Sequence, residues 1–190
     1  MSEKKTRIRI FHCVVLAAVL FFFCASAKAQ ETSSVRAKSL TAEEMAPLAL
    51  KDSMYYHFDE WFARFAAEIN RLESAESSLE NRIELMKFHF NYAGLLGELC
   101  HTLAFTSKYQ DEKISKDFLY HSRRVKKLAQ GILKDATRTQ DQEAQANLYL
   151  GASEGYIGIF EYGQGNLIVA LINGFQADSH LEKALLLNPK

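Results

Sequence analysis

The sequence is poor in the residues and motifs that carry covalent or catalytic chemistry. Its 190 residues include three cysteines, and Cys13 and Cys24 lie in an apolar N-terminal run. Cys100 is therefore the one thiol in the rest of the chain, so an intramolecular disulfide framework is excluded. No Gly-x-Ser-x-Gly nucleophile motif, glycine-rich phosphate loop or zinc-ligand spacing is present. We expect a non-enzymatic protein without a cofactor, whose fold rests on apolar burial.

The chain also lacks an excess of positive charge. It has 23 basic and 23 acidic residues, and 18 basic against 22 acidic residues remain beyond residue 29, a net charge of −4. Nucleic-acid binding depends on a concentrated positive field, so nucleic acid is excluded as a partner. The one basic cluster after residue 29 is His121–Lys127, which we interpret as the solvated face of a helix. Contact of this cluster with anionic lipid or an envelope polymer is the alternative.

No apolar run is long enough for a confident transmembrane helix, which needs roughly 20 residues. The run over 13–25 follows a basic segment and precedes Ala27-Lys28-Ala29, the pattern of a secretory signal. We therefore expect residues 1–29 to be a signal peptide cut before Gln30, and the protein to be exported to the periplasm or cell envelope. An uncleaved membrane anchor is the alternative.

Apolar residues at helical spacing dominate the rest of the sequence. Residues 30–52 are small, polar and aperiodic and are interpreted as a mobile leader, in which Thr41 could cap a short helix limited by Pro47. Residues 106–116 are expected to form a long loop. The predicted helices cover 53–72, 79–105, 117–136, 139 or 141 to 162, and 166–187.

Two groups of glycines interrupt these helices. Gly94 and Gly97 predict a close helix crossing, because a glycine in a helix costs roughly 1 kcal/mol relative to alanine. Gly151, Gly155 and Gly158 share one side of the fourth helix, which predicts close packing by the fifth. A ligand groove lined by backbone is the alternative at these three positions.

The last quarter of the chain carries a family resemblance. Ala177, Leu181, Ala184 and Pro189 follow the spacing of the second helix of a tetratricopeptide repeat, and Leu150-Gly151 matches the Leu-Gly pair of the first helix. The segment resembles a long-helixed tetratricopeptide-like hairpin. A short match between 128–133 and 181–186, at an offset of 53 residues, supports pairing the helices into hairpins.

This resemblance implies an all-α fold in which residues 53–190 form an array of about five helices in antiparallel hairpins. The first helix of each unit would line a partner-binding groove. By the match at Leu150-Gly151, the groove positions would be Gln145, Leu148, Ala152, Gly155 and Tyr156.

The resulting functional hypothesis is an exported scaffold that binds a protein or peptide. We further expect the last helix to carry more apolar surface than one neighbour can cover. The chain would then be incomplete at its C-terminus or be covered by another molecule, including a second copy.

The competing hypothesis is an exported helical bundle with a metal or small ligand in its core. Glu98-x-x-His101 has the spacing of a di-iron ligand pair. The sequence contains no second such pair, and the remaining histidines lie in unrelated contexts. No metal ligands are therefore assigned, and Cys100 is expected to be a buried, unreactive thiol.

Overall fold

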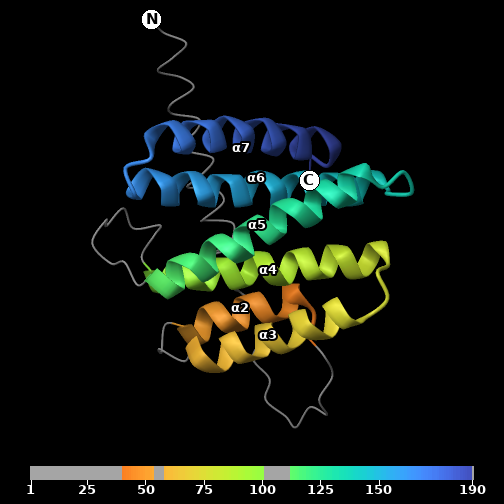
Figure 1. Ribbon diagram of the computed structural model, residues 1–190. Helices are drawn as coiled ribbons and strands as arrows, with labels where there is room; N and C mark the ends of the chain where they lie inside the picture. The colour runs from red at the N-terminus through yellow and green to blue at the C-terminus, as the bar shows by residue number, and fades with distance from the viewer. Residues whose placement is uncertain (1–39, 54–57, 101–111, 190) are drawn as a thin grey trace, which may run out of the picture. The chain divides into compact units, whose positions relative to one another are not determined.

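The computed structural model describes residues 40–53, 58–100 and 112–189. These residues form six helices and no strand, which confirms the predicted all-α class (Figure 1). The helices are α2 (Ala42–Ser53), α3 (Phe58–Ser74), α4 (Leu79–Cys100), α5 (Glu112–Lys134), α6 (Gln140–Gly163) and α7 (Leu167–Leu187).

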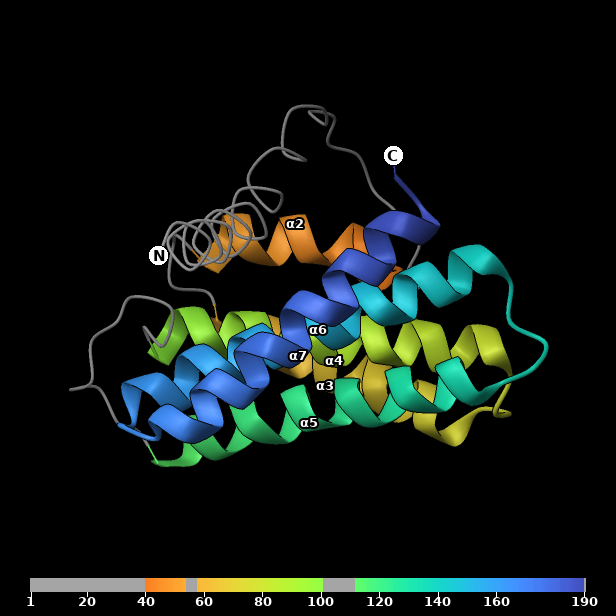
Figure 2. The same ribbon diagram turned by 90° about the horizontal axis from the view of Figure 1, so that it is seen from above.

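Each helix of the series α3 to α7 packs against its neighbour in sequence, and α2 packs on α4. In Figure 1, α4, α5, α6 and α7 follow one another from bottom to top, and α2 and α3 lie below α4. Figure 2 views this stack from above, so that the helices overlap in the picture. Consecutive helices joined by short turns lie antiparallel, because the chain reverses between them. At the turn between α6 and α7, Gly165 has φ 83°, a backbone conformation that favours glycine.

Side-chain caps define the start of two helices. The Thr139 hydroxyl accepts a hydrogen bond from the Gln142 N–H, and the Gln142 side chain accepts one from the Thr139 N–H. This reciprocal pair shows that Thr139, rather than Asp141, is the N-cap of α6. Thr41 and Glu44 make the same exchange before α2. Because α2 continues beyond Pro47, the expectation that this proline limits the helix is wrong.

Two clusters of apolar side chains hold α4, α5 and α6 together. The first is built around Met86, Val125, Ile132 and Leu150, and the second around Ala93, Leu96, Phe118 and Phe160. In α3, the large apolar residues Trp61, Phe65, Ile69 and Leu72, which recur at helical spacing, are buried. The apolar residues that recur at helical spacing in the sequence thus form the core between the helices.

Two further local predictions are wrong. Helix α5 begins at Glu112 rather than near residue 117, so part of the predicted 106–116 loop is helical. Ile114 packs against the second cluster, and this contact explains why the helix extends. Gly94 does not mark a close crossing, since a Cβ placed there would meet no atom within 4 Å.

Candidate partner-binding face

Helix α7 approaches α6 very closely at two glycines. A Cβ at Gly151 would lie 2.9 Å from the carbonyl oxygen of Ala177, and one at Gly158 would lie 3.2 Å from that of Ala170. Any side chain at Gly151 would therefore push the two backbones apart. The predicted close packing is confirmed at these two positions. At Gly155 a Cβ would make an ordinary contact, 3.9 Å from the Cβ of Ala177.

The side of α7 that faces α6 is made of small or polar residues, and its large apolar residues point away. Asn173, Gly174, Ala177 and Ala184 are the buried residues of α7. By contrast, Ile168 is 75% exposed and Phe175 is 74% exposed. We call the exposed apolar set the α7 face: Leu167, Ile168, Val169, Leu171, Ile172, Phe175, Leu185 and Leu186.

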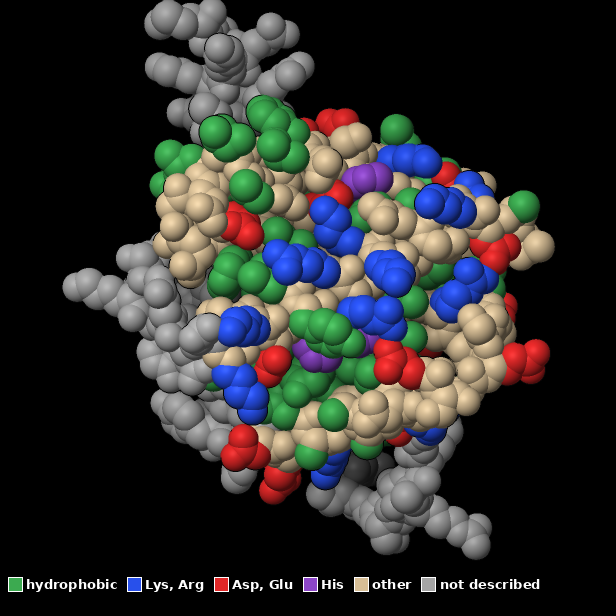
Figure 3. Space-filling model, viewed as in Figure 1, with side chains coloured by type: hydrophobic (Ala, Val, Ile, Leu, Met, Phe, Trp, Pro, Cys, Tyr) green, Lys and Arg blue, Asp and Glu red, His purple; other side chains and the backbone are tan. Residues whose placement is uncertain are grey.

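The α7 face is large and mostly free of charge. Residues 167–177 include no charged side chain, and Ile168, Leu171, Ile172 and Phe175 follow the i, i+3, i+4, i+7 spacing of one helical stripe. At roughly 200 Å² for a fully exposed large apolar side chain, the six residues of the face between 167 and 175 expose an area on the order of 700 Å². Leu185 and Leu186 lie further along α7, beyond Asp178 and the exposed Glu182. Figure 3 shows hydrophobic side chains gathered over one end of α7. Soluble monomers rarely expose more than a few hundred Å² in one apolar patch, so the α7 face has the size of an interaction surface.

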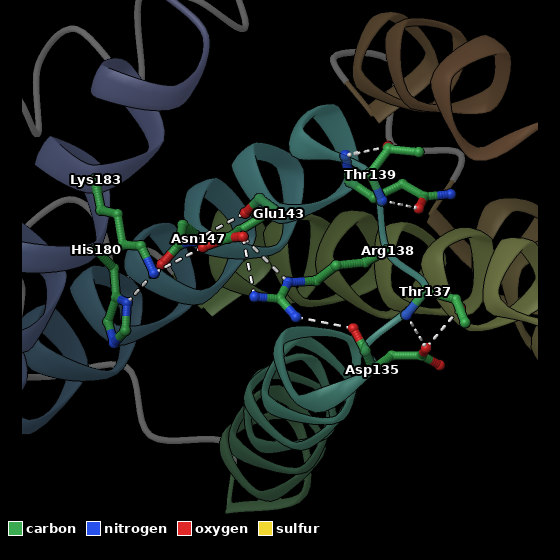
Figure 4. A network of polar contacts seen from close by, with 9 residues as sticks. Asp135, Thr137, Arg138, Thr139, Glu143, Asn147, His180 and Lys183 are labelled. Atoms are coloured by element: carbon green, nitrogen blue, oxygen red, sulfur yellow. Dashed lines mark hydrogen bonds and ion pairs between the residues drawn. The ribbon is translucent and has the colours of Figure 1, made fainter.

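A polar network fixes the rotation of α7 against α6 (Figure 4). The Lys183 ammonium lies 2.9 Å from the Glu143 carboxylate, which also lies 3.0 Å from the Arg138 guanidinium. The hydrogen bond from Lys183, with the nearby Arg138 charge, lowers the pKa of Glu143. Asn147 donates to the carbonyl oxygen of Glu143, and its own amide oxygen lies 3.0 Å from Nδ1 of His180. These contacts orient α7 so that its apolar stripe points outward.

A buried carboxylate joins α5, α6 and α7. Glu154 is 3% exposed, and its carboxylate lies 3.3 Å from Nζ of Lys126 and 3.9 Å from Nε2 of His180. Beside it, the Ser153 hydroxyl donates to the backbone carbonyl of Ser122 across 2.7 Å. Each polar group here links two helices, and we assign the cluster a structural role.

A pair of histidines, which the sequence did not predict, connects α4 and α5. Nδ1 of His89 lies 2.8 Å from Nδ1 of His121, so one ring donates a hydrogen bond to the other. Burial lowers the pKa of His89 to about 3, together with the charges of His121 and Arg124. Burial, with the Arg124 charge, lowers the pKa of His121 to about 4. Both imidazoles are therefore neutral at pH 7.

The surroundings of the pair include one carboxylate and two aromatic rings. Nε2 of His89 has no hydrogen-bond partner and lies 3.9 Å from the Glu73 carboxylate. Tyr92 and Tyr120 pack against the ring of His121. No group of three or more His, Cys, Asp or Glu residues in the described part of the chain could hold a metal ion.

The predicted groove residues lie on the less buried side of α6. Leu148 is exposed, while Gln145, Ala152, Gly155 and Tyr156 are partly buried. Ala152 and Tyr156 pack on the first core cluster, and the ring of Tyr156 is stacked on Phe90 at 5.3 Å. Burial raises the pKa of Tyr156. These two residues contribute to packing within the array, and the groove itself remains a prediction.

The structure describes only some of the other residues that the sequence analysis singled out. Glu98 is exposed, whereas His57, His101 and the side chain of Cys100 lie outside the described part of the structure. In the basic cluster, His121 and Ser122 are buried, so that segment is not a fully solvated face. No helix within the described ranges is long and apolar enough to cross a membrane.

No family model, curated protein or solved structure matches this chain. What the protein does must therefore follow from its own residues and contacts. The α7 face is the feature that departs most from an ordinary soluble surface. Its signal in the sequence is the run without charge over 167–177.

Proposed function

We propose that the protein is a non-catalytic, exported scaffold of tetratricopeptide-like hairpins that binds a helix of a protein partner on the α7 face. The observation that carries this proposal is the exposure of the large apolar residues of α7. An apolar surface of this size gains free energy when a partner covers it.

An amphipathic helix is the partner element that fits this surface best. The stripe Ile168, Leu171, Ile172 and Phe175 has helical spacing, and such stripes receive the apolar face of another helix. Within the array, α6 packs on α5 and α7 packs on α6, so a partner helix on α7 would continue the same pattern. Burying each large side chain contributes about 1.5–3 kcal/mol, and four of them can support micromolar binding after the entropic cost of association.

Photo-crosslinking tests the proposal. A photoreactive phenylalanine analogue at Phe175 is compared with the same analogue at Tyr162, an aromatic residue of α6 that is 57% exposed. We expect the probe at 175 to give a discrete adduct with a protein, and the matched probe at 162 not to do so. Mass spectrometry then identifies the adduct.

The mass of the adduct shows whether a heterologous protein or a second copy of the chain binds the α7 face. A heterologous protein supports the proposal, and an adduct of two copies of the chain would replace it with self-association. Equal or absent crosslinking at the two positions would contradict the proposal. A Phe175→Glu variant with an unchanged melting temperature shows that loss of binding is not loss of folding, since this side chain is mostly exposed.

A further inference from the structure

The exposed side of α5 is a continuous row of positive charge. Between Lys113 and Lys134, the exposed residues include no acidic side chain, and one aromatic ring, Tyr120, lies within the row. We call this set the α5 row: Lys113, Lys116, Tyr120, Arg123, Lys127, Gln130 and Lys134. At 1.5 Å per residue the row is about 30 Å long.

Two acidic residues of the neighbouring helices pair with bases at the edges of the row, and the acidic residue of α5 within this range, Asp117, is half-buried beside Lys116. Arg124 lies 2.6 Å from the Glu73 carboxylate of α3, and Lys126 lies 3.3 Å from the Glu154 carboxylate of α6. Arg123, Lys127 and Lys134 make no ion pair with any residue that the structure describes. Ion pairs with the described residues of neighbouring helices therefore do not neutralise these three bases. Figure 3 shows the Lys and Arg side chains gathered over α5 in the middle of that view.

We propose that the α5 row binds the surface of an anionic lipid bilayer. A fluid surface of anionic headgroups attracts each Lys or Arg beside it, and it needs neither a pocket nor a fixed spacing of charges. The row has spacings of three, four and seven residues between its bases and no buried donor, which suits such a surface better than a ligand of fixed geometry. Tyr120, which is 53% exposed, places an amphipathic ring where it can lie at the headgroup level.

Two other polyanions fit the row less well. An acidic protein segment needs a central apolar cluster to bind with useful affinity, and the row offers one ring. Nucleic acid is bound by domains with a strong positive excess, whereas this chain has equal numbers of basic and acidic residues. This inference is independent of the α7 face, because it rests on a different helix.

Vesicle sedimentation with the full chain tests the inference. Binding is measured to phosphatidylcholine vesicles and to vesicles in which one third of the lipid is phosphatidylglycerol, at about 50 mM and about 500 mM salt. We expect tighter binding to the anionic vesicles, with most of this excess lost at the higher salt. Binding to phosphatidylcholine alone reports every contribution other than charge.

Matched triple variants locate the charge. Arg123→Gln, Lys127→Gln and Lys134→Gln together should weaken binding to anionic vesicles roughly hundredfold. The control removes three bases outside the row: Arg64→Gln, Arg71→Gln and Lys190→Gln. It should retain most of the binding, although its net charge is the same. Equal losses in the two variants, or no excess binding of the parent chain to anionic vesicles, would overturn the inference. The inference would also be overturned if the row substitutions weakened binding to a soluble acidic polymer as much as binding to anionic vesicles.

Discussion

Acidification is expected to unfold the protein through the His89–His121 pair. The side chain of His89 is fully buried and His121 is 8% exposed. Their pKa values of about 3 and about 4 lie below the value of 6.5 for an unperturbed histidine, chiefly because of burial. The groups that face the pair are Arg124 of α5, the carboxylate of Glu73 of α3, and the two tyrosines that pack on it.

The sign of the effect follows from the proton balance. In the unfolded chain each histidine binds a proton below pH 6.5. In the folded chain His121 binds its proton only near pH 4, and His89 only near pH 3. The contribution of the pair to the free energy of unfolding is therefore fully present above pH 6.5, and it falls as the pH is lowered. One proton corresponds to about 1.4 kcal/mol per pH unit, and two to about 2.7 kcal/mol.

The loss is large on the scale of a domain. Between about pH 6.5 and about pH 4.5 it reaches roughly 5 kcal/mol, which is similar to the whole free energy of unfolding of a small protein. Asp135, whose pKa is lowered from 3.8 to about 2 by hydrogen bonds from Thr137 and Arg82, loses its contribution only at lower pH. The window above pH 4.5 thus reports mainly the histidines.

Urea unfolding followed by circular dichroism, repeated at stepped pH, measures this dependence. A His89→Gln variant keeps an amide that can bond to His121 and leaves one buried histidine. Its free energy of unfolding should start lower at pH 7.5, yet fall with about half the slope of the parent chain. Parallel curves for the two proteins, or a stability independent of pH between 6.5 and 4.5, would refute the reasoning.

Three further predictions concern packing, capping and processing. Gly151→Ala should lower the free energy of unfolding by about 1–3 kcal/mol. Gly155→Ala should stay within about 1 kcal/mol of the parent in the same denaturation assay, because its Cβ has room. Thr139→Ala should cost about 1 kcal/mol, most of which Thr139→Ser should restore. Exported protein should have the intact mass of a chain that begins at Gln30, and retention of residues 1–29 would show an uncleaved anchor instead.

The helices that local signals define were predictable from the sequence. For α6 and α7 the predicted bounds agree with the structure to within a residue or two, because Thr139 caps one helix and Gly165 turns the chain before the other. The start of α5 was not predictable, since it depends on the tertiary contact of Ile114 with the second cluster.

A candidate site was predictable from the sequence only where all its residues lie on one helix. The excess apolar surface of α7 is visible as a run without charge. The side of α7 that faces outward, however, is set by the contacts of Gly151 and Gly158 with its backbone. The His89–His121 pair joins residues 32 positions apart on two helices, so no local spacing could indicate it. The same holds for Glu154, whose partners come from α5 and α7.

The most direct test of the proposed function is the affinity of the crosslinked partner for matched glutamate variants. Phe175→Glu places a charge on the α7 face, and Tyr162→Glu places one on an exposed aromatic position of α6. If the α7 face binds the partner, Phe175→Glu should weaken binding at least roughly thirtyfold, as for a hot-spot residue, while Tyr162→Glu should leave it almost unchanged. Equal affinities of the two variants, both close to that of the parent chain, would contradict the assignment of α7 as the partner-binding helix.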